Sequence, residues 1–172
     1  EYAPKKPVGI YIVYRMEDQP QRANEGPYTM ERLVEFAQAG DMDGLGECFS
    51  PSAKGDAEDM PEKVKELAEF LCEQTVTWEF YTWTENIEML DGAKAATREM
   101  FFYLHTDNGL YRCDIREVLE SRDLADVGVC SVSVFPALYP GEEPEYEDEL
   151  YKGYCTWGRD NAGISIVYCQ EN

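Results

Sequence analysis

The chain has 172 residues, 44% of them hydrophobic and 13% aromatic, and its 35 acidic and 15 basic side chains give a net charge of −20. This apolar content excludes a disordered chain, and no apolar run approaches the roughly 18 residues that span a bilayer. The negative field repels phosphate backbones and anionic lipid, so nucleic-acid binding is disfavoured. A cationic ligand or a basic protein partner is favoured.

The sequence begins at Glu1 without an initiator methionine or a signal peptide, so we expect a processed product. It contains six cysteines, without a CxxC motif or clustered histidines, and therefore predicts no zinc site and no cofactor. Four of the cysteines fall in apolar patterns, where a thiol acts as a small hydrophobic group. Cys155 and Cys169 flank an expected hairpin and are the only pair that we consider for a disulfide.

Residues 8–14 are rich in β-branched and aromatic side chains and predict a strand, and the polar residues 17–27 predict a linker. A helix follows, capped by Thr29 and ended by Gly40. Its apolar residues lie on one face at i, i+3, i+4 and i+7: Met30, Leu33, Val34 and Ala37.

Asp41 is expected to cap a short second helix that ends at Ser50-Pro51. Its predicted inward residues are Met42, Leu45, Cys48 and Phe49. Pro61 lies in the first turn of a third helix, in which Lys65 and Glu69 mark the solvent face. The predicted buried residues of this helix are Met60, Val64, Leu67, Ala68 and Leu71.

After residue 75 the apolar period changes from 3.6 to 2, which is typical of strands. Residues 98–118 predict a β-hairpin, because Asn108-Gly109 suits a type I′ turn. That turn sets four pairs opposite each other: Leu104 and Cys113, Phe102 and Ile115, Tyr103 and Asp114, His105 and Arg112. We expect Phe102, Leu104, Cys113 and Ile115 to be buried against the helices, and Tyr103, Arg112 and Arg116 to be more exposed.

A further strand is predicted at 128–135, a proline- and acid-rich loop at 137–149, and a last strand at 163–168. Helices followed by an antiparallel sheet predict an α+β fold with the helices on one sheet face. We expect a single domain over 1–172. It consists of an N-terminal strand and linker (1–27), a core (28–137), and an acidic loop with a C-terminal hairpin (138–172).

The chain from Met30 to Phe135 resembles a family of uncharacterised secreted or lipid-anchored proteins of Gram-positive, Clostridia-like bacteria. The matching segments are Gly40-Asp41, Glu47 to Ser50, Val64 to Leu71, Thr106-Asp107, Tyr111-Arg112, Asp126 to Val129 and Gly163 to Ile166. The resemblance implies a cystatin-like cone fold, shared with nuclear transport factor 2, ketosteroid isomerase and scytalone dehydratase. It also implies an extracellular or surface-anchored bacterial protein, with a lipid anchor outside this chain.

Candidate site residues come from the hairpin and from the strand before it. Tyr103 beside Asp114 would suit enolate chemistry, with the carboxylate as base and the phenol as oxyanion donor, and Tyr111 is a second phenol. On an exposed sheet face the same residues form an ordinary cross-strand pair. Trp78 is expected in the core, and Trp83, of opposite parity, as an exposed binding aromatic. His105 is the only histidine, so any histidine-based dyad or metal cluster would centre on it.

Three functions remain open. The leading hypothesis is a non-catalytic, exported domain that binds an unknown small ligand or protein, because we find no catalytic signature. The second is a cofactor-free isomerase or dehydratase that uses Asp114 with Tyr103 or Tyr111. The third is an acidic inhibitor of a basic protein, which the net charge and the acidic segment 142–149 suggest. The ligand and the oligomeric state are not predicted.

Overall fold

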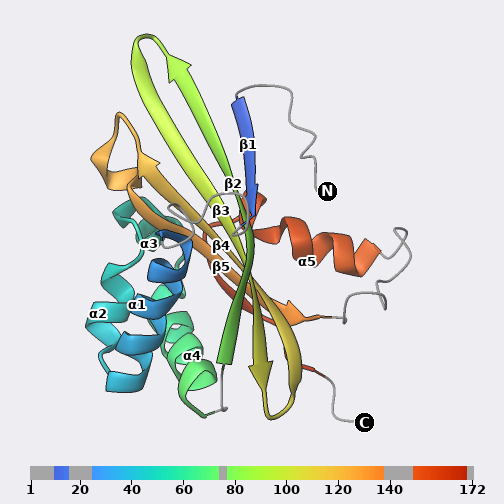
Figure 1. The fold of residues 1–172 in the computed structure, drawn as a ribbon. Coiled ribbons are helices and arrows are strands. Elements are labelled where there is room, and N and C mark those ends of the chain that lie inside the picture. Colours follow the sequence, from blue (N-terminus) through green and yellow to red (C-terminus); the bar gives the residue numbers. More distant parts are fainter. Residues whose placement is uncertain (1–9, 16–24, 74–76, 138–148, 170–172) are drawn as a thin grey trace.

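The computed structural model describes residues 10–15, 25–73, 77–137 and 149–169. The fold is α+β, as predicted, with a six-stranded sheet in the order β1-β2-β3-β4-β5-β6. Neighbouring strands are antiparallel from β1 to β5, and β6 runs parallel to β5. Figure 1 shows helices α1 to α4 on one side of the sheet and α5 on the other. We call these the helix-layer face and the α5 face.

The two long helices of the helix layer confirm the predicted apolar stripes. Helix α1 spans Glu25–Ala39 and α4 spans Met60–Glu73. Because α1 begins at Glu25, Thr29 lies inside the helix and does not cap it, contrary to prediction. Gly40 ends α1 in a left-handed conformation with φ of +68°. The stripe residues buried in the core are Met30, Leu33, Ala37, Met60, Val64, Leu67, Ala68 and Leu71.

Two short helices connect α1 with α4. Asp41 caps α2 (Met42–Glu47), as predicted, by accepting a hydrogen bond of 2.8 Å from the Gly44 backbone N–H. The helix ends before Ser50, because Ser50 itself caps an unpredicted helix α3 (Pro51–Asp56). Leu45, Cys48 and Phe49 are buried as expected. Met42 is 36% exposed, so its predicted inward position was wrong.

The sheet is built around three long strands, β2 (Thr77–Leu90), β3 (Ala93–Thr106) and β4 (Gly109–Glu120). Strands β2 and β3 are joined by Asp91-Gly92, with φ of +51° and +78°. Positive φ at both residues is characteristic of a type I′ turn, the tight connection that matches the twist of two antiparallel strands. Strand β1 (Ile10–Arg15) pairs with the outer edge of β2, where a strand at 8–14 was predicted; residues 8 and 9 lie outside the described part of the chain.

The β3–β4 hairpin has the predicted faces but a register shifted by two residues. Thr106 pairs with Gly109, so Leu104 lies opposite Tyr111 and Phe102 opposite Cys113. Asn108 lacks the positive φ of a type I′ turn, which was therefore wrong at this position. A two-residue shift leaves every side chain on its predicted face. The residues expected in the core are buried, namely Phe102, Leu104, Cys113 and Ile115, whereas Tyr103, Arg112 and Arg116 are partly exposed.

A β-bulge at Tyr81 changes which face β2 presents. Phe80 pairs with Phe102 and Thr82 pairs with Phe101, so Tyr81 is the extra residue. The insertion reverses the parity of the strand beyond it. Trp83 therefore points into the core and is 2% exposed, whereas Tyr81 is 56% exposed. The prediction of Trp83 as an exposed aromatic was wrong for this reason.

The C-terminal part differs most from expectation. Strand β5 (Gly128–Pro136) confirms the strand predicted at 128–135, and residues 138–148 of the acidic loop lie outside the described part. The expected hairpin is instead helix α5 (Glu149–Asp160) followed by β6 (Gly163–Ile166). A helical crossover of this kind allows β6 to pair parallel with β5. All six cysteines are free, so the pair considered for a disulfide, Cys155 and Cys169, is not bonded in the structure.

No helix in the described ranges is both long and apolar enough to cross a membrane.

Phe102→Ala should destabilise the fold strongly, because this fully buried ring packs against Trp78 and Phe80 at centroid distances of 5.9 and 5.2 Å. We expect a loss of about 3–5 kcal/mol in the free energy of unfolding. Leu124→Ala is the control, because a side chain that is 81% exposed should contribute within about 0.5 kcal/mol. Urea unfolding measures both, and equal effects would contradict the assigned core.

Candidate functional site

The structure divides the five predicted site residues between the two faces of the sheet. Trp78, Trp83 and Tyr111 lie on the helix-layer face. Tyr111 is 1% exposed, and its hydroxyl accepts a hydrogen bond of 3.0 Å from the Cys169 backbone N–H. Tyr103 and Asp114 lie on the α5 face. Tyr111 therefore cannot act on the same substrate as Asp114, and the three aromatic side chains of the helix-layer face belong to the hydrophobic core or pack against it.

Asp114 is held by an arginine, and Tyr103 is not its cross-strand partner. In the observed register Tyr103 pairs with Arg112, and Asp114 pairs with Phe101. Arg112 donates two hydrogen bonds to Asp114, from Nε to Oδ1 at 2.7 Å and from an Nη to Oδ2 at 3.1 Å. The guanidinium also lies 4.9 Å from the centre of the Phe101 ring. Such bidentate geometry fixes the orientation of the carboxylate.

Helix α5 covers this ion pair. Tyr151 and Tyr154 pack on Phe135 with ring centroids 6.0 and 5.8 Å away. Near the end of the helix the Ser131 hydroxyl donates a 2.9 Å hydrogen bond to the Gly158 carbonyl. A Cβ at Gly158 would lie 2.8 Å from Ser131 Oγ, so the close approach of helix and sheet requires glycine. The helix therefore covers the Arg112–Asp114 pair in part, and the two side chains remain 24% and 13% exposed.

Burial changes the proton affinity of the groups beneath α5. Removal from water raises the pKa of Asp114 to about 6, an effect that Glu99 increases and that Arg112 and Arg159 oppose. Burial also raises the pKa of the Cys155 thiol on α5 and of the Cys113 thiol on the opposite face. Thiols shifted in this direction stay protonated at neutral pH and do not serve as nucleophiles.

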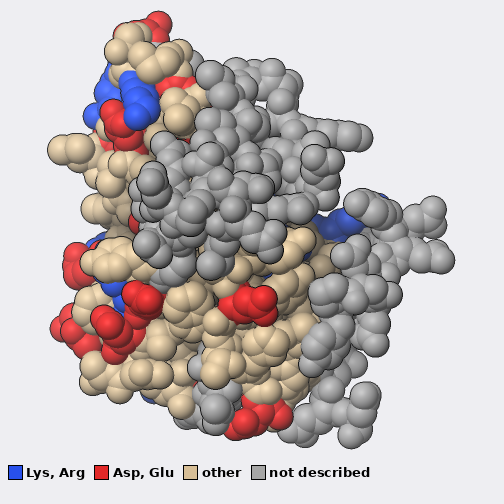
Figure 2. Space-filling model, viewed as in Figure 1, with Lys and Arg blue, Asp and Glu red and all other residues tan. Residues whose placement is uncertain are grey.

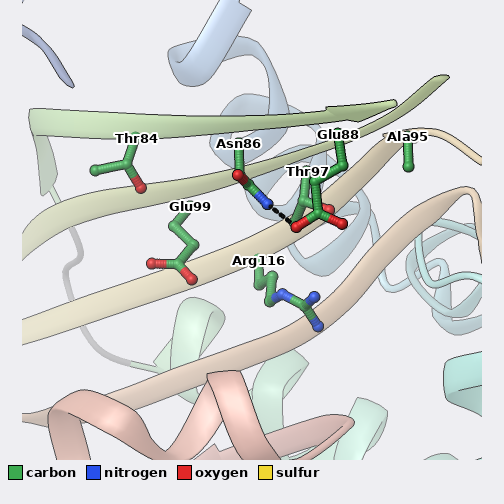
Figure 3. A pocket seen from close by; sticks show the side chains of 7 residues that line it. All are labelled: Thr84, Asn86, Glu88, Ala95, Thr97, Glu99 and Arg116. Atoms are coloured by element: carbon green, nitrogen blue, oxygen red, sulfur yellow. Dashed lines mark hydrogen bonds between the residues drawn. The ribbon is translucent and has the colours of Figure 1, made fainter. Parts of the chain in front are cut away.

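A polar hollow of about 110 Å³ lies on the α5 face beyond the end of the helix (Figure 3). Thr84, Glu99 and Arg116 lie in one row across β2, β3 and β4 and form part of its wall. The remaining lining residues are Asn86, Glu88, Ala95 and Thr97. A second hollow, of only about 20 Å³, runs beneath α5 toward Asp114 and shares Glu99 and Arg116 with the first.

The polar groups of the larger hollow are only partly satisfied. Glu99 Oε2 lies 3.4 Å from Arg159 Nε on α5, and Glu88 Oε1 accepts a 2.8 Å hydrogen bond from Asn86 Nδ2. The other amide atom, Asn86 Oδ1, is buried and has no hydrogen-bond partner. Thr84 is 3% exposed, and its side chain forms no hydrogen bond among the described residues. Within that same part of the chain, no carboxylate forms an ion pair with Arg116.

His105 does not contribute to either hollow. It lies at the exposed end of β3, where it pairs with Leu110 and not with Arg112 as predicted. Its Nε2 is 3.7 Å from Glu79 Oε2. Among the described residues, no group of three or more histidine, cysteine, aspartate or glutamate side chains is arranged to hold a metal ion.

The negative charge of the chain is visible on the helix layer. Figure 2 shows acidic side chains spread over the region of α1 to α4, while the basic side chains in this view lie mainly at the upper end, near the β2–β3 hairpin. The helix layer thus presents an acidic surface, separate from the hollow on the opposite face of the sheet.

Residues 32–137 match the family described as a domain of unknown function (DUF5104), a match that spans more than half of the chain. The chain belongs to this family. The DUF5104 region runs from α1 through β5 and contains every residue that lines the larger hollow. It ends before α5, the helix that covers Asp114. No curated protein and no solved structure is significantly similar to the chain.

Asp114→Asn should change how stability depends on pH. Because burial raises the pKa of Asp114 from 3.8 to about 6, the folded protein binds this proton more tightly than the unfolded chain does. The stabilising effect is complete below the unfolded value and is lost as pH rises through the folded value. Relative to the variant, the wild type should therefore lose at most about 3 kcal/mol of unfolding free energy between about pH 4 and pH 7.

Urea unfolding of both proteins over this pH range measures the difference. A wild type that instead gains stability over Asp114→Asn as the pH rises would show that the charge of Arg112, and not burial, controls this carboxyl group.

Proposed function

We propose that this DUF5104 protein is a non-catalytic domain that binds a small polar ligand in the hollow between Glu99 and Arg116. The observation that carries the proposal is the set of unsatisfied polar groups in that hollow. In the described chain Arg116 forms no ion pair, the Thr84 hydroxyl forms no hydrogen bond, and Asn86 Oδ1 is buried without a partner. Buried polar groups are normally hydrogen-bonded, because leaving them unpaired costs free energy. A bound ligand would pair with the Arg116 guanidinium and the Thr84 hydroxyl, the two of these groups that it can reach.

The size of the hollow limits the ligand. Sites for drug-sized molecules enclose roughly 300–1,000 Å³ and are mainly apolar. The hollow here measures about 110 Å³, and Ala95 is the only apolar residue among those that line it. The geometry therefore favours a small molecule held by hydrogen bonds and charge over a large hydrophobic one.

One observation favours the alternative of a cofactor-free isomerase or dehydratase. The raised pKa of Asp114, about 6, is suited to proton transfer near neutral pH. A general base must, however, reach the proton of a bound substrate. Both oxygens of Asp114 accept hydrogen bonds from Arg112, and the adjacent hollow of about 20 Å³ has room for little more than a water molecule. These features support a structural role for Asp114.

A second alternative is an acidic inhibitor of a basic protein, favoured by the acidic surface of the helix layer (Figure 2). Such a complex would weaken steeply with salt, because long-range charge attraction steers its association. Of the acidic segment 142–149, only Glu149 lies within the described residues. Export from a bacterial cell, with a lipid anchor outside this chain, remains a proposal that the family resemblance supports.

A fragment screen by NMR tests the proposed site. We expect polar fragments to shift amide signals of β2, β3 and β4 around the hollow, and Arg116→Gln with Glu99→Gln to reduce both the number of hits and their affinity. Arg122→Gln with Glu69→Gln is the matched control, because both side chains are exposed and neither lines the hollow. If no fragment maps to the hollow, or if the control pair has the same effect, the proposed site is wrong.

A further inference from the structure

Resting on the proposed function, we infer that the ligand is a small zwitterion, with a carboxylate bound by Arg116 and an ammonium group bound by Glu99 and Thr84. A small amino acid has this chemistry. The inference rests on the combination of charges in the hollow, on the unsatisfied atoms, and on the space available between them.

The charges of the hollow disfavour a ligand that carries a single charge. A simple anion would meet the carboxylates of Glu88 and Glu99 and the field of a chain with net charge −20. A simple cation would meet the guanidinium of Arg116, which has no carboxylate partner in the described chain to neutralise it. A ligand with both charges satisfies both sets of groups at once.

The two charged ends of the hollow are directed apart. Glu99 and Arg116 lie directly opposite each other on β3 and β4, a position in which unlike charges usually pair. Figure 3 shows instead that the Glu99 carboxylate turns to one side and the Arg116 guanidinium to the other. Glu99 is engaged by Arg159 at 3.4 Å. The guanidinium is therefore left to receive a carboxylate from a ligand, which it can bind through two parallel hydrogen bonds.

The ammonium end is defined by acceptors. Asn86 donates its amide N–H to Glu88, which fixes the orientation of the amide and directs Oδ1 away as an acceptor. Oδ1 itself is buried out of reach of a ligand, and the acceptors that line the hollow beside it are the Thr84 hydroxyl and the Glu99 carboxylate. An ammonium group has three donors and no acceptor, so it matches a carboxylate and a hydroxyl oxygen.

The volume sets the size of the zwitterion. A protein cavity of about 150 Å³ accommodates benzene. The hollow, at about 110 Å³, is somewhat smaller. Glycine and alanine fit this limit, whereas amino acids with long side chains would have to extend out of the hollow.

Titration of the labelled protein with matched probes tests the inference. Alanine carries both charges, propionate only the carboxylate, and ethylamine only the ammonium group. We expect alanine to bind at least tenfold more tightly than either single-charge probe, a difference of about 1.4 kcal/mol. Arg116→Gln should remove the affinity advantage that alanine has over ethylamine. Glu99→Gln should remove the affinity advantage that alanine has over propionate. The NMR spectrum of each variant shows whether it is folded, and Arg122→Gln and Glu69→Gln are the matched controls.

The outcomes separate this inference from the proposed function. If ethylamine binds as tightly as alanine and Arg116→Gln changes neither, the zwitterion is wrong but the hollow remains a binding site for cations. If alanine and glycine cause no shifts while other fragments do map to the hollow, the ligand class is again wrong and the site stands. If neither these probes nor any fragment shifts signals of the hollow, both proposals fail.

Discussion

The candidate site depends on how far α5 reaches along the sheet. At 1.5 Å per residue a helix of 12 residues is about 18 Å long, whereas a strand of 14 residues such as β3 extends about 46 Å. A helix of this length covers less than half of the face on which it lies. Its last turn rests on Ser131 and Glu99 through Gly158 and Arg159. Where the helix ends, none of the described helices covers the polar face of β2, β3 and β4, and the larger hollow lies at that point.

The part of the sheet that α5 covers also determines which charged side chains are paired. Beneath α5, Arg112 and Asp114 are largely shielded from water and form a bidentate pair. On the helix-layer face, Arg98 is likewise bound to a carboxylate at 3.0 Å and stacked 4.9 Å from the Trp83 ring centre. Arg116 lies past the end of α5, where water and solutes can reach it. A charge in that position can remain available to a ligand at little cost to stability, which is why we place binding there and not at Asp114.

Much of the fold could be predicted because it follows from the period of the apolar residues in the helices and from their alternation between the two faces of each strand. The amphipathic helices α1 and α4 could be predicted from the spacing of their apolar residues. The predicted faces of β3 and β4 are correct although the predicted register is not, because the register differs by two residues and side chains alternate with a period of two. The bulge at Tyr81 has no signal in the sequence, and it alone reversed the expected place of Trp83. Asp91-Gly92, by contrast, is a standard signature of a type I′ turn and could have identified the long β2–β3 hairpin. Helix α5 could also have been predicted from the sequence. Its residues Tyr151, Tyr154, Cys155 and Gly158 lie at i, i+3, i+4 and i+7, which is a helical spacing, within an aromatic-rich segment.

The candidate site could be predicted only in part, because it depends on pairings that span three strands. The sequence placed Arg116 on the polar face of the hairpin, but Thr84 and Asn86 reach that face only because of the bulge. The implied cone fold directed attention to a pocket between the sheet and the helix layer. Phe102, Trp83 and their aromatic neighbours are buried in the core on that side of the sheet, packed as closely as a protein interior usually is. Among the described elements, the helix layer covers one face of the sheet and α5 covers part of the other. A small polar ligand can therefore bind at the part of the α5 face that lies beyond the helix. For that reason the unsatisfied groups of β2, β3 and β4, and not the buried Asp114, carry the functional inference.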